Sequence, residues 1–458
     1  MRPVNRLPPE ILSCIVKDVP KYSDKDARAI IPLTHVCRYW RDSIISTPGN
    51  WTIISNSQAN LATLSLERAK AAPLEIYLDM EEMRKSPQFL DLLIPHLQNT
   101  RTLLVDRLST HEDLFLFSQH PMTNLRSLTL SGGGRADRDR SIDPFKSSAY
   151  TLRYLKLDRV PLYPSFLDLK TLTELDLRDL QCDLHLDTIL DFLEENHSLA
   201  RATIWIRFIG PSLRSSRRRT AIGSRLLSLR ITCNDAMDGQ ALISNIALSK
   251  GAELKFNCRG DYDVRVGVID VLSGISTSHL SCLVSPTFML YVVRSRFIQL
   301  LGPNGTASFY SDSDSNIPFV EFPRLPLTNI RHFRLHNYEW RPPGPTSFPQ
   351  LTSFPALETL TIESGIKLSH LLSALFSNPS ALPSLKTLAF LNCVITEEFM
   401  QELSQFASDR KNATLARIHR VIIIHPNGLF PSNASIRKLG ERVPIVDVRV
   451  AEELPTEL

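Results

Sequence analysis

The chain has 458 residues, of which 43% are hydrophobic and 22% charged, and its formal net charge is +4. These values are ordinary for a globular protein and leave room for one large elongated domain or two to three compact ones. The small net charge does not favour a nucleic-acid-binding protein. No apolar run approaches the length of a membrane span, and the first five residues lack the apolar core of a signal peptide. Seven scattered cysteines without a CxxC pair are typical of reduced thiols, so we expect a cytoplasmic and/or nuclear protein.

Two short amphipathic helices are expected between residues 7 and 51. Pro8–Pro9 suits the first turn of a helix, and apolar residues follow at spacings of three and four until Pro20. Pro32 is expected to begin the second helix. A turn at 47–49 should return Trp51 toward the helices. Neither helix can bury its own apolar face, so we expect the pair to dock onto another surface. The stripe of the second helix comprises Leu33, Val36, Cys37, Trp40 and Ile44.

This segment resembles an F-box in the form common in mushroom-type fungi. The resemblance rests on LPPEIL at 7–12, VCRYWRD at 36–42 and TPGNW at 47–51, and it extends to LERAKAAPLEI at 66–76. The spacer at 17–31 is longer and more charged than in a compact F-box. In the family, the F-box binds the adaptor subunit of an SCF-type cullin–RING ubiquitin ligase. The resemblance implies that the adaptor, and through it a cullin, is bound by Leu7, Pro8, Ile11, Leu12, Val36, Cys37 and Trp40.

The frame L-x-x-L-x-L recurs through the rest of the chain. Apart from the stretch between the copies at 251 and 330, consecutive copies begin mostly 25 to 28 residues apart, with one gap of 20 and one of 33. This is the period of leucine-rich repeats, in which the last two apolar residues lie on a short strand and single repeats are stable only when stacked. Clear copies begin at Leu125, Leu152, Leu172, Leu226, Ile330, Leu357 and Leu385, and weaker ones at Thr100, Leu199, Gly251 and Ile418.

These patterns predict a mixed α/β fold. An all-α F-box (1–55) is followed by a linking helix and first strand (56–95), an irregular leucine-rich-repeat solenoid (96–450) and a tail (451–458). The solenoid should have a curved parallel β-sheet on its concave face and helices or loops on its convex face, with helices at 188–193 and 368–376. The repeat degenerates near 260–325, where Leu280 and Ala307 can open irregular copies.

The residues that flank the last two apolar positions of each frame should project from the concave face. Their central row is rich in basic residues in its middle part and turns apolar near Ile422. Trp205 is a candidate hot spot, although a covering helix or loop is an equally good interpretation. The candidate substrate-binding residues are Tyr154, Lys156, Asp176, Trp205, Arg230, Lys255 and Arg334.

No catalytic motif is evident, and we expect neither an enzyme nor a cofactor. The chain has no G-x-S-x-G and no H-E-x-x-H. Cys233, Cys258 and Cys393 follow their frames at nearby offsets, which favours a ladder of small buried residues over a metal site. Three polar segments, at 132–140, 214–219 and 311–316, are interpreted as solvated loops. The alternatives are a phosphate cradle, a localisation signal, and a calcium loop or phosphorylation target, respectively.

Two hypotheses follow from the sequence. In the first, the chain is the substrate receptor of a ubiquitin ligase, with the F-box on the adaptor and the solenoid on an unknown protein substrate. In the second, the helical module is an N-terminal cap and the solenoid is a stand-alone interaction scaffold. The sequence does not identify the substrate.

Overall fold

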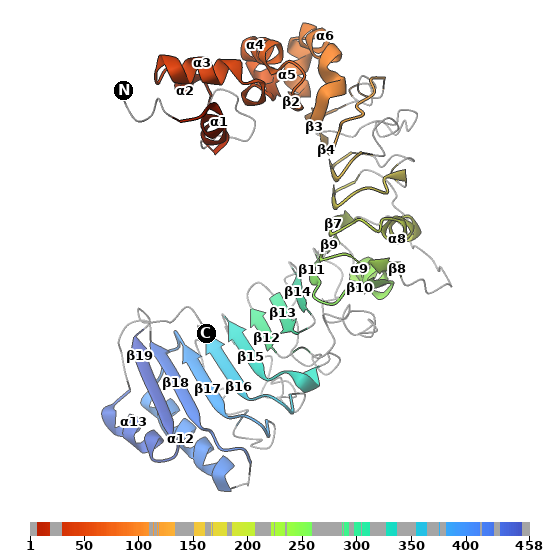
Figure 1. Cartoon of the computed structure of the whole chain (residues 1–458). Helices are drawn as coiled ribbons and strands as arrows, with labels where there is room; N and C mark the ends of the chain where they lie inside the picture. Colours follow the sequence, from red (N-terminus) through yellow and green to blue (C-terminus); the bar gives the residue numbers. More distant parts are fainter. Residues whose placement is uncertain are drawn as a thin grey trace. The chain divides into compact units, whose positions relative to one another are not determined.

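The computed structural model describes most of the chain. The described residues are 7–18, 30–109, 113, 117, 119–132, 151–160, 166, 168–180, 186–206, 221–223, 225–233, 236–258, 286, 288–292, 297–303, 305–311, 327–336, 354–363, 375, 382–412, 415–425 and 431–450. They form a mixed α/β structure with large, mainly parallel sheets (Figure 1). The chain divides into two compact units, Met1–Gly210 and Pro211–Leu458. This boundary falls inside the region predicted as one solenoid.

The first unit begins with a helical module of α1 (Pro9–Asp18), α2 (Ile30–Thr34), α3 (Arg38–Ser46) and the 3₁₀ helix η3 (Pro48–Asn50). α3 packs against α1 and α2. The turn before Trp51 was predicted correctly: this indole is buried and donates from Nε1 to the Ile44 carbonyl at 3.0 Å. The guanidinium of Arg68, on α4 (Ala59–Ala69), lies 4.3 Å from the Trp51 ring centroid.

The prediction of one continuous helix from Pro32 is wrong. α2 ends at Thr34, and Cys37 is in an extended conformation (φ −164°, ψ 171°) before α3 begins. Nε of Arg41 donates to the Thr34 carbonyl at 3.1 Å and thereby satisfies one acceptor at the end of α2. The break separates residues that a single helix would place on one stripe: Val36 is 54% exposed, whereas Trp40 is 8% exposed.

The sheet of the first unit begins earlier than predicted. β1 pairs with β2, and each strand up to β7 pairs in parallel with the next one along the chain. β1 therefore lies inside the segment predicted as all-α. The strands are β1 (Ile53–Ser55), β2 (Leu74–Asp79), β3 (Thr100–Leu108), β4 (Ser127–Gly132), β5 (Tyr154–Asp158), β6 (Glu174–Arg178) and β7 (Arg201–Ile206). The connecting helices are α4, η4 (Asn56–Gln58), α5 (Met80–Lys85), α6 (Gln88–Leu93), η5 (Ile94–Asn99) and α8 (Leu186–Glu195).

The repeat frame coincides with these strands. Leu128, Leu155, Leu175 and Ala202 are successive Cα partners across β4 to β7, and all four are buried. The alternating burial along β4, β5 and β6 leaves the intervening side chains half-exposed on the opposite face. The helix predicted at 188–193 is confirmed by α8, whose Phe192 stacks on Phe166 with ring centroids 4.2 Å apart.

The second unit contains a sheet that is parallel at both ends and interrupted in the middle. β9 pairs with β11 and β11 with β14 in parallel, but β13 runs antiparallel to both β14 and β12. β12 then pairs with β15, and parallel pairing continues to β19. Its strands are β9 (Ser228–Cys233), β11 (Glu253–Cys258), β12 (Phe288–Val292), β13 (Phe297–Gly302), β14 (Gly305–Ser311), β15 (His332–His336), β16 (Thr359–Glu363), β17 (Thr387–Leu391), β18 (Arg420–His425) and β19 (Ile445–Val450).

The prediction of a wholly parallel sheet is therefore wrong within 260–325. A meander of β12, β13 and β14 occupies this stretch, and its apolar alternation lacks the repeat period. Ala307 and Phe309 nevertheless have the register of a frame copy, because they are the Cα partners of Leu254 and Phe256. The remaining elements of the unit are β8 (Ala221–Gly223) paired with β10 (Ile246–Leu248), and α9 (Ala236–Ser244), η10 (Leu327–Asn329), α12 (Glu397–Asn412) and α13 (Asn433–Gly440).

Side chains that precede the frame connect one repeat to the previous one. The hydroxyls of Thr151 and Thr171 donate to the carbonyls of Leu125 and Leu152 at 2.9 and 2.7 Å. In the second unit, Oγ of Ser384 donates to the carbonyl of Pro355 at 2.8 Å. Each donor immediately precedes the first apolar residue of its frame, so the repeat also appears in the hydrogen bonding.

Residues at or just after the ends of four strands share an unusual backbone conformation; Arg107 is the last but one residue of β3, and the other three follow β5, β6 and β17. Arg107, Arg159, Asp179 and Asn392 have φ between 44° and 58°, a region that non-glycine residues rarely adopt. All four lie two residues after the last apolar residue of their frame. The residue types did not indicate this conformation, because none of the four is a glycine.

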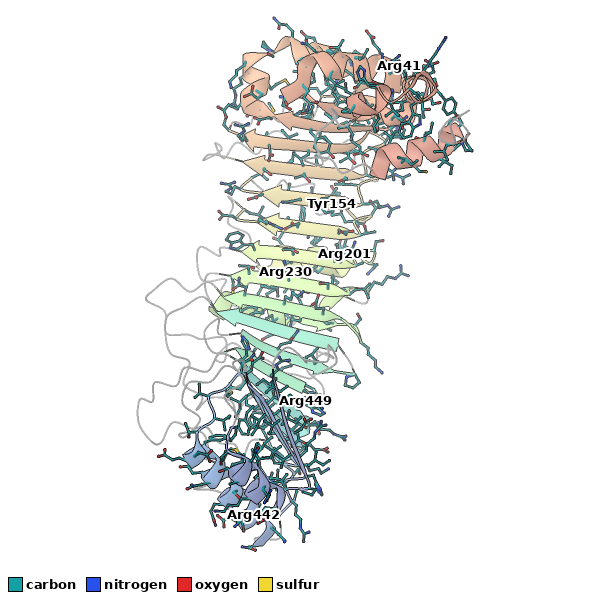
Figure 2. All side chains as sticks on the ribbon, turned by 90° about the vertical axis from the view of Figure 1, so that its left-hand side faces the viewer. Arg41, Tyr154, Arg201, Arg230, Arg442 and Arg449 are labelled. Carbon is teal, nitrogen blue, oxygen red and sulfur yellow. The ribbon has the colours of Figure 1, made fainter. Side chains whose placement is uncertain are left out.

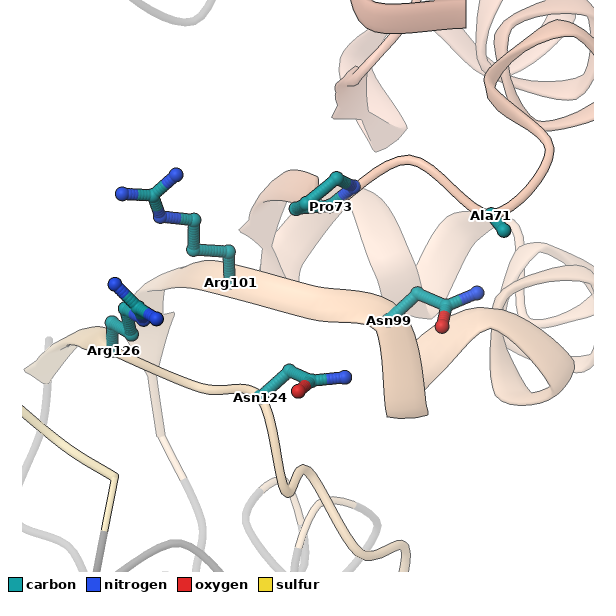
Figure 3. Close-up of a pocket in the computed structure, with 6 residues that line it drawn as sticks. All are labelled: Ala71, Pro73, Asn99, Arg101, Asn124 and Arg126. Carbon is teal, nitrogen blue, oxygen red and sulfur yellow. The ribbon is translucent and has the colours of Figure 1, made fainter.

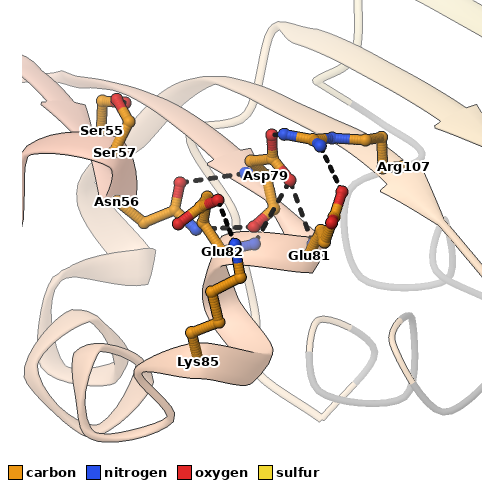
Figure 4. A network of polar contacts seen from close by, with 8 residues as sticks. All are labelled: Ser55, Asn56, Ser57, Asp79, Glu81, Glu82, Lys85 and Arg107. Atoms are coloured by element: carbon orange, nitrogen blue, oxygen red, sulfur yellow. Dashed lines mark hydrogen bonds and ion pairs between the residues drawn. The ribbon is translucent and has the colours of Figure 1, made fainter.

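A polar network connects the first strands of the first unit (Figure 4). Asn56 donates to the Asp79 carbonyl at 2.7 Å and accepts from the Asp79 amide at 3.0 Å. The Asp79 carboxylate caps α5 by accepting from the amides of Glu81 and Glu82 at 3.0 and 3.4 Å, and it also forms an ion pair with Arg107. Asn56 is the first residue of η4, directly after β1, so this network connects the end of β1 to β2, α5 and β3.

Candidate functional site

The residues implied at the adaptor divide into a buried set and an accessible set. Leu12 and Trp40 are 1% and 8% exposed and belong to the core of the helical module. Ile11 and Val36 are 47% and 54% exposed, and Pro8 is exposed as well. The structure thus leaves only part of the implied set free for a partner.

The first turn of α1 is fixed against α3. The hydroxyl of Tyr39 donates to the Leu7 carbonyl at 2.5 Å, and Oγ of Ser13 donates to Oδ1 of Asn50 at 2.8 Å. Leu7 and Cys37 are half-buried. Val16 is buried and therefore belongs to the core of the module.

Exposed large apolar side chains are concentrated in this module. Ile11, Ile31 and Val36 are 40% to 54% exposed. Elsewhere in the described part of the chain, the large apolar residues with comparable exposure are Leu227, Val394 and Ile445. Half of these six therefore lie within the first 36 residues, where the sequence analysis expected a docking surface.

The seven candidate substrate-binding residues are divided between the two units. In the first unit, Lys156 and Asp176 are direct Cα partners in the row that continues from Thr129 to Thr203. Figure 2 labels Tyr154 and Arg201, which come from strands of this sheet. In the second unit, Arg230 and Lys255 are Cα partners, whereas Arg334 lies four strand positions further along the sheet.

Ion pairs neutralise much of the charge around Asp176. Arg178 donates from Nε and Nη2 to the two Asp176 carboxylate oxygens at 2.8 Å each, and this interaction raises the pKa of Arg178. Burial, followed by the charges of Asp176 and Glu174, raises the pKa of Tyr154. Glu174 also forms an ion pair with Arg201. Lys156 has no ion-pair partner among the described residues.

Arg334 belongs to a compact charged group in the second unit. Its Nη2 lies 2.7 Å from Oε2 of Glu363, and Nδ1 of His336 lies 2.9 Å from the same oxygen. Burial of Glu363 acts to raise its pKa, but hydrogen bonds from Arg334 and His336 outweigh burial, so the pKa is lowered overall. Lys255 is likewise paired with Glu253 at 2.7 Å, whereas Arg230 is exposed and unpaired within the described residues.

Trp205 is half-buried, which is intermediate between an open hot spot and a covered side chain. At the end of the row, where the sequence turns apolar, Ala389, Leu391, Ile422 and Ile424 form a buried cluster.

A pocket that the sequence analysis missed lies at the start of β3 and β4 in the first unit. Its volume is about 220 Å³, and it is lined by Ala71, Pro73, Asn99, Arg101, Asn124 and Arg126 (Figure 3). A sequence signal existed, because Asn-x-Arg occurs at 99–101 and again at 124–126, in the same position relative to successive frames.

The described residues contain no group of three or more histidine, cysteine, aspartate and glutamate side chains suited to a metal ion. Cys233 and Cys258 are Cα partners, and Cys233 and Cys393 are buried, as a ladder of small residues predicts. Most of the polar segments at 132–140, 214–219 and 311–316, and the helix expected at 368–376 apart from Leu375, lie outside the described residues.

No helix in the described part of the chain has the length and apolar character that crossing a membrane requires. No protein-family model matches the chain, and no curated protein matches it at a significant level.

Proposed function

We propose that this protein is the substrate-recognition subunit of an SCF-type cullin–RING ubiquitin ligase. In this proposal, an N-terminal F-box binds the adaptor, and a leucine-rich-repeat solenoid binds a protein substrate. The protein catalyses no step itself but raises the effective concentration of the substrate at the ligase. It acts in the cytoplasm and/or nucleus.

The observation that carries the proposal is the concentration of exposed apolar side chains on the helical module. Ile11, Ile31 and Val36 remain accessible although Leu12, Trp40 and Ile44 already form a core. A module that only capped the sheet would have little use for this surface. The stacked frames, with their in-register leucines and their repeated hydrogen bonds between repeats, support the solenoid.

Burial narrows the adaptor surface that the resemblance implies. We assign direct contact to Pro8, Ile11 and Val36, with Leu7 and Cys37 at the margin, and a supporting role to Leu12 and Trp40. The substrate would contact the half-exposed face of a sheet in either unit. Lys156 in the first unit and Arg230 in the second carry charges that no described residue neutralises.

The test is direct binding of the purified full-length chain to purified adaptor. We expect Ile11→Asp/Val36→Asp to abolish binding without changing the melting temperature. Val394→Asp serves as the matched control, because Val394 is 64% exposed and lies in the second unit. Failure of the wild-type chain to bind adaptor, or equal binding by the double variant, would contradict the proposal. Charged substitutions at Leu12 or Trp40 are unsuitable because they would unfold the module.

A cap on a non-ligase scaffold is the second candidate. This candidate is favoured because the helical module continues directly into the sheet. The Trp51 ring lies against the Arg68 guanidinium, and β1 begins at Ile53, two residues after Trp51. Deletion of residues 1–46 separates the two candidates. If the module is a cap, the deletion should abolish the cooperative unfolding of the first unit. If the module is an F-box, the deletion should abolish adaptor binding and leave the sheet folded.

A further inference from the structure

Three arginines lie in line across the start of the first unit's sheet. The amide of Arg126 donates to the carbonyl of Arg101 at 2.8 Å, and the amide of Arg153 donates to the carbonyl of Arg126 at 2.8 Å. Neighbouring strands are about 4.8 Å apart, so the three side chains begin at that spacing. All three are exposed. We call them the arginine row.

At the equivalent frame position in the second unit, the charges of successive residues alternate in sign instead of being all positive. Arg331, Glu358 and Lys386 are joined by the same backbone hydrogen bonds, from Glu358 N to Arg331 O and from Lys386 N to Glu358 O. Their charges alternate, and Nζ of Lys386 lies 3.4 Å from the Glu358 carboxylate. Like charges on directly opposite strand positions are destabilising, whereas opposite charges are favourable. Repulsion within the arginine row should therefore destabilise the first unit, and the repeat frame itself does not require like charges at this position.

No acidic side chain offsets this cost among the described residues. Neither Arg101 nor Arg126 forms an ion pair there, although Arg107, Arg178 and Arg201 of the same unit each have a carboxylate partner. Nη1 of Arg153 donates to the Thr171 carbonyl at 3.0 Å, which adds no negative charge. An external anion would remove the repulsion.

Arg101 lies at a β-bulge in the pairing of β2 with β3. In the pairing of β2 with β3, Leu74 opposes Thr100 and Glu75 opposes Thr102, so Arg101 is the extra residue of a β-bulge. Bulges redirect a side chain, and they are frequent beside functional sites. Figure 3 shows the Arg101 and Arg126 side chains on the same side of the pocket, with Asn99 and Asn124 side by side.

The pocket fits a compact oxyanion. Its volume of about 220 Å³ corresponds to roughly seven water molecules at about 30 Å³ each, which is enough for a phosphate group and its attachment. Two guanidinium groups can bind phosphate through paired N–H donors, and a phosphate dianion would balance both of their charges.

We propose that the Arg101–Arg126 pocket binds a phosphorylated side chain of a partner protein, with Arg153 available for a further acidic residue of the same segment. Ala71 and Pro73 supply an apolar wall suited to a peptide. Among the described lining residues no side chain is aromatic, so none offers a ring on which a nucleobase could stack, which disfavours single-stranded nucleic acid. The inference deepens the proposed function and rests on it only for the partner's role as a ubiquitination substrate.

The test uses the full-length chain without adaptor, so a failure of adaptor binding would not affect it. The probe is a degenerate pool of phosphoserine and phosphothreonine peptides, compared with the same pool unphosphorylated. We expect enrichment of phosphorylated peptides and a loss of affinity of at least tenfold in Arg101→Gln/Arg126→Gln. The control is Arg331→Gln/Lys386→Gln, which removes the same charge from the same frame positions and should bind as wild type. Circular dichroism verifies that both variants are folded.

Several results would overturn the proposal. These are no preference for phosphorylated peptides, an unchanged affinity in Arg101→Gln/Arg126→Gln, or an equal loss in both double variants, which would indicate general electrostatic attraction. Two further arms identify other ligands, namely inorganic phosphate followed by ³¹P line broadening and a single-stranded oligonucleotide. Binding of either one in the absence of peptide binding would assign the pocket to that ligand and exclude a protein partner.

Discussion

The guanidinium of Arg410 donates from Nη2 to the carbonyl of Leu382 at 2.8 Å, although Arg410 is fully buried. Nη2 also contacts the carbonyls of Pro383 and Leu385 at 3.4 Å each, and Nε donates to the carbonyl of Ala416 at 3.2 Å. One side chain of α12 therefore satisfies carbonyl groups on both sides of the helix in sequence. Burial lowers the pKa of Arg410 from its ordinary value.

Replacement of Arg410 by methionine should destabilise the second unit. The substitution keeps an unbranched stem but removes the side-chain donors to four carbonyl groups, of which those of Leu382 and Pro383 keep a backbone donor. We expect a loss of about 3 kcal/mol in the free energy of unfolding. Urea denaturation followed by circular dichroism measures this loss. Lys411→Met is the control, because Lys411 is exposed on the same helix and should change stability by less than about 0.5 kcal/mol. Equal effects of the two substitutions would exclude the proposed role of Arg410.

Tyr39→Phe should loosen the first turn of α1. It removes the 2.5 Å hydrogen bond from the Tyr39 hydroxyl to the Leu7 carbonyl while keeping the ring. We expect a destabilisation of about 1 kcal/mol and faster hydrogen exchange at the amides of α1. Mass spectrometry of exchange resolves the effect by segment. Unchanged exchange in α1 would mean that this hydrogen bond does not hold the turn.

Stability should fall at acidic pH through Glu363. Its pKa in the folded protein is lowered from the ordinary value of 4.5, so the unfolded state binds the proton more tightly. The resulting stabilisation is fully present above about pH 4.5, and it is lost as the pH falls through the lower folded value. Glu363→Gln should cost about 1 to 2 kcal/mol at pH 7, and the difference from wild type should shrink below pH 4. Denaturation curves at several pH values measure this difference. A pH-independent difference would indicate that packing, rather than charge, is responsible.

Gly239 lies in α9 at a point where no side chain fits. A β-carbon there would lie 2.5 Å from Cζ of Phe256 and 2.8 Å from Sγ of Cys233. Gly239→Ala should therefore destabilise the second unit by about 1 to 3 kcal/mol, despite the higher helix propensity of alanine. The control is Gly440→Ala in α13, where a β-carbon meets nothing within 4 Å and stability should stay equal or rise. Thermal unfolding of both variants decides the matter, and a neutral Gly239→Ala would show that Phe256 can shift.

The sequence predicted strand positions well and helix continuity poorly. The clear and weaker copies of the frame, from Leu103/Val105 to Val421/Ile423, lie on strands with those residues buried, and the irregular copy at Ala307/Phe309 also lies on a strand. This success has a simple cause, since alternation along a strand needs only local sequence. The break at His35–Cys37 was missed because Val36 and Trp40 satisfy the helical spacing whether or not the backbone between them is helical.

The sequence predicted which residues of the sheets face solvent, but it did not predict which of their charges are paired. Sequence spacing indicated which side chains of the sheet face solvent, and the register confirms that Lys156 and Asp176 are neighbours. It did not reveal that Arg334 is engaged by Glu363, because the two are 29 residues apart in sequence. The repeated Asn-x-Arg at 99–101 and 124–126 indicates that these side chains share a frame position. The pocket itself required the structure, since the one-residue bulge at Arg101 has no clear sequence signal.

The sequence by itself determined the period of the apolar residues, and with it the mainly parallel sheets and the row of side chains that faces solvent. Only the tertiary structure decided which of the residues expected at the adaptor are accessible and which charges are already paired. It also decided that three arginines lie in line without a described acidic partner. The physical reason is that burial of an apolar frame follows from local alternation, whereas accessibility and charge pairing depend on contacts between residues distant in the chain.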